Sequence, residues 1–485
     1  MILKVFSNLY DSVILTVGPQ ALGTKIQVDA NTDPPSVKDE LVCELLQELD
    51  PCKSMGPDHI HPRVLSELAD IVVKSFSIIF EKLRRLGDVP EDWKKSSVIP
   101  IYKKGFKGGS RKLEAHQSYF ITERILLGAI TSQMKHVTGK SQHGFTKGKL
   151  CLTNQIAFYN KVTCLVDVGQ AVDIVCLDFS KAFHMVSHSL LLEKTMHYGL
   201  DKWSVQWVGN WLTGRTQRVV VNNSFSNWQP VTSGVPQGSI LGPKLLNIFI
   251  SDLDDGIKCT LVKFADDTKL NGEVDTSEGR ATMQEDLDRL EEWANKNLMK
   301  FNKDKCKVLH LEKHNPGEQY RLGSTWLGNS SVERDLGVLV DKQLNMSEQC
   351  AAAAKKAHRM LGCINMGITS RHKKSLFHST QHLSGHTWNT CAQFWSLLYK
   401  KDVDRLERAQ RRATKMMKGL GSLPCEDRLR ELGLFSLEKR RLRGDLITMF
   451  QYLKGGYKED GDSLFTRSHL EKTRGNECKL LLGRF

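Results

Sequence analysis

The 485-residue sequence has no run of 18 or more apolar residues, so no ordinary membrane-spanning helix is expected. It has twelve cysteines but no Cys-x-x-Cys pair, so neither a zinc ribbon nor a disulfide framework is indicated. The N-terminus is fairly apolar, but Asp11 interrupts it and no good cleavage site follows, so we predict no signal peptide. These absences predict an intracellular protein with reduced thiols, in the nucleus or the cytoplasm.

The sequence carries an excess of positive charge. Lys and Arg total 69 against 55 Asp and Glu, which gives a formal net charge of +14. A soluble chain this basic most often binds a polyanion, and nucleic acid is the first candidate, although a merely basic surface explains the charge equally well. With 40% hydrophobic residues, the chain is long enough for packed cores in about two to four domains.

Helical and strand patterns alternate along the chain, which predicts an α+β fold. Apolar runs predict strands at 171–180, 307–311 and 335–341, and a hairpin around Asn222-Asn223. The segment 106–120 is polar and without pattern. From about residue 346 the sequence becomes helical and basic. One amphipathic helix within 282–301 should bury the side chains that share its apolar side: Met283, Leu287, Leu290, Ala294 and Leu298.

Three aspartates follow predicted strands. Asp178 ends one apolar run, and Asp266 and Asp267 lie at the turn between two others. Adjacent strands would bring these carboxylates to one edge of a sheet, where like charges raise each other's pKa. Mg²⁺ relieves such repulsion because it prefers oxygen ligands, and the Phe179 carbonyl is a further candidate ligand. The alternative is ordinary turn chemistry, since Asp is common in hairpin turns.

Several motifs occur together in a fixed order. They are "LDFSKAF", "SGVPQGSILGP", "FADDT" and "FNKDKCKVLHL", preceded by "KSMGPDHIHPRVL", "VIPIYKKG" and "QHGFTKGK". In this order the chain resembles the reverse transcriptases of non-LTR (LINE-type) retrotransposons, of the jockey and chicken-repeat group. The resemblance covers about residues 37–456.

The resemblance implies a right-hand polymerase with fingers, palm and thumb and an antiparallel palm sheet packed on helices. The reverse transcriptase domain is expected at about 84–342. The implied segments are a poorly ordered N-terminal extension at 1–36, a fingers-like region at 37–150, a palm with interleaved fingers elements at 151–345, a basic thumb-like region at 346–456 and a tail at 457–485.

The implied activity is RNA-directed DNA synthesis, in which dNTPs are added to a primer 3′-OH on an RNA template by two Mg²⁺ ions, with Mn²⁺ as a possible substitute. Asp178 and Asp266 resemble the metal ligands, Asp267 assists, and Lys305 resembles a proton donor to the leaving pyrophosphate. Phe183 resembles the steric gate that excludes ribonucleotides; otherwise it is a core residue. The other implied substrate-binding residues are Lys103, Lys104, Pro236, Gln237 and Gly238.

A basic helix is expected to contact the nucleic-acid backbone. Its cations recur three or four residues apart, and they are Arg405, Arg408, Arg411, Arg412 and Lys415. The alternative is a solvated helix face.

Two departures from the family pattern give an alternative function. His184 replaces an acid, and 106–124 lacks the Asn-Tyr-Arg-Pro stretch of the fingers. The chain would then be a catalytically impaired, nucleic-acid-binding remnant. Since only about 36 residues precede the motifs, we expect no endonuclease domain here.

Overall fold

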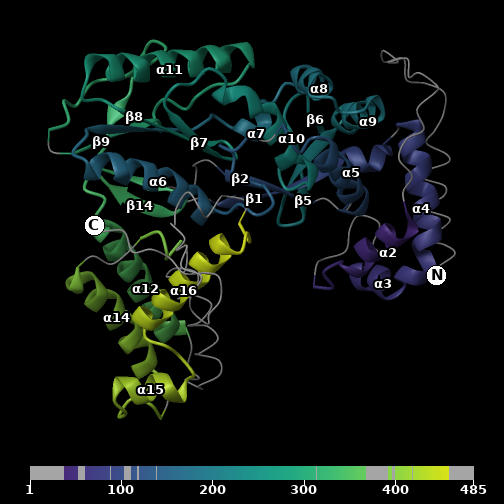
Figure 1. Cartoon of the computed structure of the whole chain (residues 1–485). Helices are drawn as coiled ribbons and strands as arrows, with labels where there is room; N and C mark the ends of the chain where they lie inside the picture. The colour runs from purple at the N-terminus through teal and green to yellow at the C-terminus, as the bar shows by residue number, and fades with distance from the viewer. Residues whose placement is uncertain are drawn as a thin grey trace, which may run out of the picture. The chain divides into compact units, whose positions relative to one another are not determined.

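The computed structural model describes most of the chain, as residues 38–52, 61–87, 89–102, 111–116, 120–137, 139–312, 314–367, 391–395, 399–417 and 419–457 (Figure 1). The predicted N-terminal extension, nearly all of the predicted tail, and Lys103 and Lys104 lie outside these residues. The chain divides into two units, each made of separate segments. Unit 1 is 1–142, 179–255 and 292–301, and unit 2 is 143–178, 256–291 and 302–485.

Unit 1 combines helices with one mixed sheet. Its elements are α2 (Asp39–Gln47), α3 (Pro62–Glu67), α4 (Ala69–Leu86), η1 (Glu91–Lys94), β1 (Lys95–Tyr102), β2 (Arg111–His116), α5 (Phe120–Gln133), α7 (Ala182–Met185), α8 (His188–His197), α9 (Lys202–Leu212), β4 (Thr216–Val221), β5 (Ser224–Phe225), β6 (Gln229–Pro230), α10 (Leu241–Phe249) and η2 (Ser251–Asp254).

The unit 1 sheet is built on β1. This strand pairs antiparallel with β2 and parallel with β4, and β4 pairs antiparallel with both β5 and β6. The predicted hairpin is confirmed: Val221 pairs with Ser224, and both intervening asparagines have a left-handed φ (48° and 62°), as a two-residue hairpin turn requires. The prediction of no pattern at 106–120 is wrong at 111–116, where β2 completes a ladder with β1.

Unit 2 contains the longest helices and the second large sheet. Its elements are α6 (Cys151–Asp167), β3 (Val172–Leu177), β7 (Thr260–Phe264), β8 (Asp267–Glu273), α11 (Ser277–Lys296, whose last turn belongs to unit 1), β9 (Lys307–Leu311), β10 (Arg321–Leu322), β11 (Thr325–Trp326), β12 (Gly328–Asn329), β13 (Val332–Asp335), β14 (Val338–Asp341), α12 (Ser347–Gly367), α14 (Lys400–Lys415), α15 (Cys425–Glu431) and α16 (Leu437–Leu453).

The unit 2 sheet has the strand order β12-β9-β3-β8-β7. Its central strand β3 is antiparallel to both neighbours, β8 and β9. Figure 1 shows α6 on one face and α11 on the other. The chain is therefore of the predicted α+β class, with a mainly antiparallel sheet packed on helices.

The core of unit 2 lies between the α6 face of the sheet and the C-terminal helices. Phe158 and Val162 of α6 pack with Ile174 of β3, and the same cluster extends to Trp395 and to Ala409 of α14. All five side chains are fully buried. The sheet is therefore held on the α6 side by the largest apolar cluster described for this unit.

Three predicted elements differ in detail. The predicted strand at 335–341 is a hairpin, because Leu336 (φ 43°) and Gly337 (φ 92°) turn the chain between β13 and β14. Leu298 is 60% exposed because α11 ends at Lys296, so the helical period no longer places it on the apolar side. Phe183 lies in the short helix α7 and not at a strand end, and it is half-buried.

No helix among the described residues is both long enough and apolar enough to cross a membrane.

Candidate active site

Asp178 and Asp267 lie side by side at one end of the unit 2 sheet. Leu177, the last residue of β3, pairs with Thr268 of β8, and the next residues outward on the two strands are Asp178 and Asp267. If the antiparallel register continues by one residue, Asp178 lies opposite Asp267, and residues directly opposite each other place their side chains on the same face of the sheet. The sheet therefore brings together two of the three predicted carboxylates.

The third carboxylate, Asp266, belongs to the tight turn between β7 and β8. Phe264 pairs with Asp267, so only Ala265 and Asp266 form the loop, and Ala265 has a left-handed φ of 55°. Gly144, of the motif "QHGFTKGK", lies directly against this turn, because a Cβ at Gly144 would overlap the backbone nitrogen of Ala265. The motif therefore needs glycine there for packing against the turn.

Lys305 reaches the same end of the sheet from the loop before β9. Its ammonium lies 2.8 Å from Asp178 Oδ2. The loop is fixed by backbone hydrogen bonds, since Asn302 N donates to the Asp178 carbonyl (2.7 Å) and Lys305 N donates to the Asn302 carbonyl (2.9 Å). The structure therefore brings together the predicted proton donor and a predicted metal ligand.

The surroundings of Asp267 raise the pKa of its carboxyl group. The pKa of Asp267 is raised to about 6. Although this side chain keeps exposed surface, the largest cause is partial desolvation by the protein atoms crowded around the carboxyl; repulsion from Asp266 and then from Asp178 adds to the rise, and Lys269 opposes it. Asp266 and Asp178 are thus close enough to Asp267 to destabilise its charge.

These side chains open onto a cleft of about 430 Å³ in unit 2. Asp178 and Asp267 line it, together with Lys305, Lys307 and Arg334. Ligand sites typically enclose roughly 300–1,000 Å³, so this cleft is large enough for a small molecule or part of a polymer. The lining is mixed in charge, since Asp304, Glu333 and Asp335 also belong to it, and its cations lie beside the carboxylates where an anionic ligand would approach a bound metal ion.

Beneath the carboxylates lies a buried ion pair that the sequence did not predict. Lys269 Nζ is 2.8 Å from Asp335 Oδ2 and donates to Asn154 Oδ1 at 2.8 Å, and both charged side chains are 6% exposed. The ammonium also lies over the ring of Phe158, 4.7 Å from its centroid. The only signal in the sequence is the strand period: Lys269 is two residues after Asp267 and therefore lies on the same face of β8.

The carboxylate cluster fits a divalent cation in its chemistry. Its donors are oxygens, and their mutual repulsion is the condition that a cation relieves. Within the described ranges, no group of three or more His, Cys, Asp or Glu side chains already has an arrangement that could hold a metal ion. Phe179, the predicted backbone ligand, is buried, and its ring stacks on Phe301 at 4.3 Å.

In unit 1 the structure brings together the predicted substrate-binding loop and Phe183. Val235 N donates to the Phe183 carbonyl (2.7 Å), and Gly234 has a φ of 89°. A Cβ at Gly234 would lie 2.6 Å from the Phe183 carbonyl oxygen, so the close approach that this glycine permits is to the chain itself. Just before α10, whose N-cap residue is Ile240, Ser239 Oγ accepts from Gly242 N of the first helical turn (2.9 Å).

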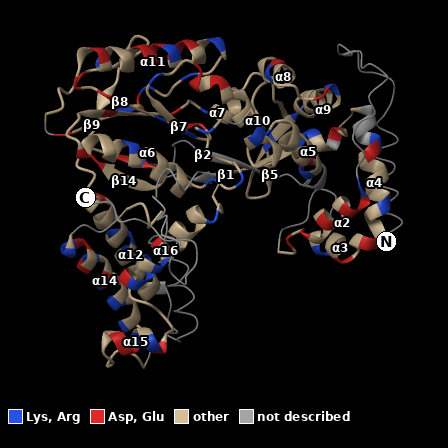
Figure 2. Cartoon of the chain, in the orientation of Figure 1, with Lys and Arg blue, Asp and Glu red and all other residues tan. Residues whose placement is uncertain are grey.

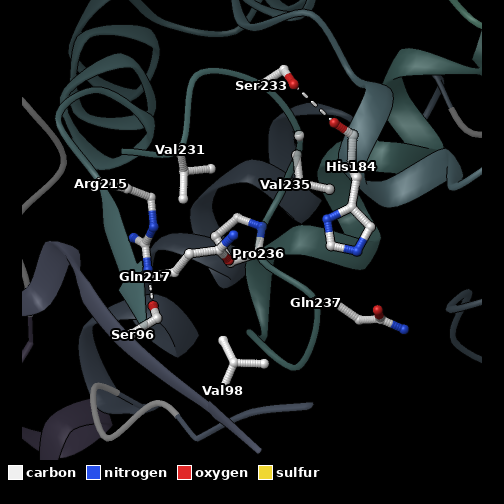
Figure 3. A pocket seen from close by; sticks show the side chains of 11 residues that line it. Ser96, Val98, His184, Arg215, Gln217, Val231, Ser233, Val235, Pro236 and Gln237 are labelled. Atoms are coloured by element: carbon white, nitrogen blue, oxygen red, sulfur yellow. Dashed lines mark hydrogen bonds between the residues drawn. The ribbon is translucent and has the colours of Figure 1, made fainter. Parts of the chain in front are cut away.

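A small cavity of about 50 Å³ lies beside this loop (Figure 3). Figure 3 shows Arg215, Gln217 and Ser96 on one side of it and His184 and Gln237 on the other. Arg215 is buried and donates to Ser96 Oγ (3.3 Å). The enclosed volume is well below the roughly 300 Å³ of typical ligand sites, so a nucleotide would not fit within this cavity alone.

The predicted basic helix is α14, which carries a run of Lys and Arg (Figure 2). Four of the five predicted cations share its exposed side: Arg408, Arg411, Arg412 and Lys415. Arg405 differs, because it is half-buried and its guanidinium pairs with the buried Asp402 at 3.2 Å. The exposed four are spaced as one face of a helix and are available to a polyanion.

Comparison with known proteins agrees with the motif order. The family model described as "Reverse transcriptase (RNA-dependent DNA polymerase)" matches residues 101–364, more than half of the chain. The chain is 24% identical over 431 residues to the probable RNA-directed DNA polymerase from transposon BS of Drosophila melanogaster, covering 81% of this chain and 46% of that protein. It is 26% identical over 358 residues to the RNA-directed DNA polymerase from the mobile element jockey of the same species, covering 70% of this chain and 38% of that protein.

The chain thus spans less than half the length of these two relatives. Among solved structures, it is similar to an apo telomerase from Candida tropicalis, with a TM-score of 0.36 and 11% identity over 60% of this chain and 62% of that one.

Proposed function

The chain belongs to the reverse transcriptase (RNA-dependent DNA polymerase) family, and from this premise we propose that it synthesises DNA on an RNA template by adding dNTPs to a primer 3′-OH. The observation that carries the proposal is the pairing of β3 with β8, which aligns Asp178 with Asp267 next to the Asp266 turn. Two divalent ions bound there would activate the attacking hydroxyl and stabilise the leaving oxygen.

Each acidic residue then has a role. Asp178 and Asp266 would hold the Mg²⁺ ions, Asp267 would assist, and the Phe179 carbonyl would offer a further oxygen ligand. The raised pKa of Asp267 supports this assignment: after desolvation, its main cause is repulsion from Asp266 and Asp178, which a bound cation would relieve. Mn²⁺ is expected to substitute, since it accepts the same oxygen ligands.

Lys305 is proposed to protonate the leaving pyrophosphate. Its contact with Asp178 supports this role, because the contact holds the ammonium at the cleft where the phosphates would lie. With Asp178 holding a metal ion, the Lys305 ammonium would be free to turn toward the substrate. A general acid of this kind contributes roughly 10²–10⁴-fold to a rate.

The remaining predicted residues position the substrates. Phe183 is proposed as the gate against ribonucleotides, and Pro236, Gln237 and Gly238 as the contact to the incoming base. Both groups belong to one backbone-bonded assembly of unit 1. The exposed cations of α14 are proposed to bind the template–primer phosphates without reading sequence. Lys103 and Lys104 stay predictions for triphosphate binding.

The test is primer extension on an RNA template with Mg²⁺ or Mn²⁺. We expect Asp266→Asn to lower incorporation by about 10²–10⁴-fold, because a metal contributes several kcal/mol and each 1.36 kcal/mol is tenfold. The control is Asp288→Asn, which removes an exposed acid of α11 that accepts from Gln284. Equal activity in wild type and Asp266→Asn would refute the proposal.

A different result would favour the second function. RNA binding that weakens steeply with salt, without any dNTP incorporation by the wild-type chain, would indicate a binding remnant of such a polymerase. The structural feature that favours it is His184, which stands in place of the family's acid and lines the cavity beside Gln237.

A further inference from the structure

We propose that the hairpin formed by β4, β5 and β6 is a stacking platform for the unpaired bases of single-stranded nucleic acid. The platform consists of Arg218, Phe225 and Trp228. This inference rests on the proposed function, since it names a second place where the template strand would be held.

The hairpin has a well-defined register. Asn222 and Asn223 make its two-residue turn, and Ser226 locks the returning strand to Val219 by two hydrogen bonds of 2.9 Å, one through its N–H and one through its hydroxyl oxygen. Gln217 pairs with Gln229, so continuing the ladder by one residue places Trp228 opposite Arg218. The aromatic residues are therefore held in fixed positions on both sides of one cation.

Arg218 lies between the two rings. Its guanidinium carbon is 4.2 Å from the Phe225 ring centroid and 4.6 Å from that of Trp228. Arg218 Nε donates to Ser97 Oγ at 3.2 Å, which ties the side chain to β1. Successive residues of a strand point to opposite faces, so this cluster lies on the face of the sheet away from Gln217 and the small cavity.

The rings are exposed although they are large and apolar. Phe225 is 57% exposed and Trp228 is 40% exposed, and every residue from 221 to 230 is exposed. If Arg218 served only to shield the aromatics, it would leave roughly half of their surface in water. Aromatic side chains with an adjacent Arg are the means by which proteins bind single strands without sequence preference, because every base has a π-face.

The charge around the platform favours a polyanion. No Asp or Glu occurs between Asp201 and Asp252. A nucleic-acid strand would thus find the two rings beside the Arg218 cation, with no acid in this stretch of sequence to repel its phosphates.

The test measures binding to the full chain in the presence of EDTA. The probes are a fluorescent 12-nucleotide single-stranded RNA and a blunt duplex of the same length, compared by anisotropy. We expect Trp228→Ala and Phe225→Ala each to weaken single-strand binding by about 5–150-fold, the effect of losing one stacked base, and to change duplex binding by less than about twofold.

The matched control is Trp326→Ala, which removes a still more exposed tryptophan (63%) from β11 in unit 2 and should leave both affinities unchanged. Trp228→Phe should recover most of the lost affinity, and an unchanged urea midpoint shows that each variant folds. Equal losses for single strand and duplex, or no loss, would overturn the platform. Since the assay uses no dNTP or metal, failure of DNA synthesis would not affect its outcome.

Discussion

Replacing Lys269 by methionine should destabilise the chain severely, because it leaves the Asp335 carboxylate buried without its cation. The pair is 6% exposed on both sides and 2.8 Å apart, so water cannot take the place of the missing partner. Removing one member of such a pair typically costs about 3–5 kcal/mol. Asp335→Leu should cost a similar amount, since it leaves the ammonium buried.

The double variant Lys269→Met/Asp335→Leu is expected to be much more stable than either single variant. It buries no charge, and two penalties remain: the Asn154 side-chain oxygen loses the donor that Lys269 provided, and the buried Tyr159 hydroxyl loses Asp335 as its acceptor. An unpaired buried acceptor costs about 1–3 kcal/mol. The two substitutions should therefore be strongly non-additive.

The assay is urea unfolding followed by far-UV circular dichroism and by tryptophan fluorescence, with midpoints and slopes compared among the variants. The control is Lys258→Met, because the Lys258–Glu285 pair is exposed (56% and 55%) and should contribute less than about 1 kcal/mol. Single variants that cost less than about 1 kcal/mol, or a double variant that costs the sum of the singles, would refute this reasoning.

Three further predictions concern unit 2. The hydrogen bond between His310 and Asp173 raises the pKa of the imidazole above its usual value. The stabilisation it gives is therefore complete below about pH 6.5 and is lost as the pH rises through the folded-state pKa. The difference in urea midpoint between wild type and His310→Gln should shrink from pH 5.5 to pH 9, and a constant difference would contradict it. Gly144→Ala should destabilise by more than about 2 kcal/mol, because its Cβ overlaps the Ala265 backbone, and a neutral result would show that the turn can move. Gly362→Ala, in an open position of α12, should stabilise by about 1 kcal/mol in the same unfolding assay, and a loss would contradict the helix propensity argument.

The carboxylate site was predictable because the sequence carries it in local patterns. The order of residues alone indicates a buried run that ends in Asp178 and a tight turn at Asp266. Antiparallel pairing of the strands then brings the carboxylates together. The asparagine hairpin was predictable for the same reason, since its turn depends on two residues.

What could not be predicted depends on contacts between distant segments. Lys269 and Asp335 are 66 residues apart, and nothing local marks either as one half of a pair. The strand β2 was missed because its polar sequence lacks the alternation of a half-buried strand. Trp228 and Phe225 were seen only as hairpin residues, because their position around Arg218 follows from the register and not from composition.

The division of the chain into interleaved units has a consequence for synthesis and for fragment design. The chain passes between the units after residues 142, 178, 255, 291 and 301. Unit 1 therefore has all its segments only after the ribosome has released residue 301. By then much of unit 2 has also been synthesised, but its C-terminal helices are still missing. No single cut separates the units. A fragment that contains one whole unit, such as 1–301 or 143–485, always carries pieces of the other unit, and one protease cut leaves at least one unit incomplete.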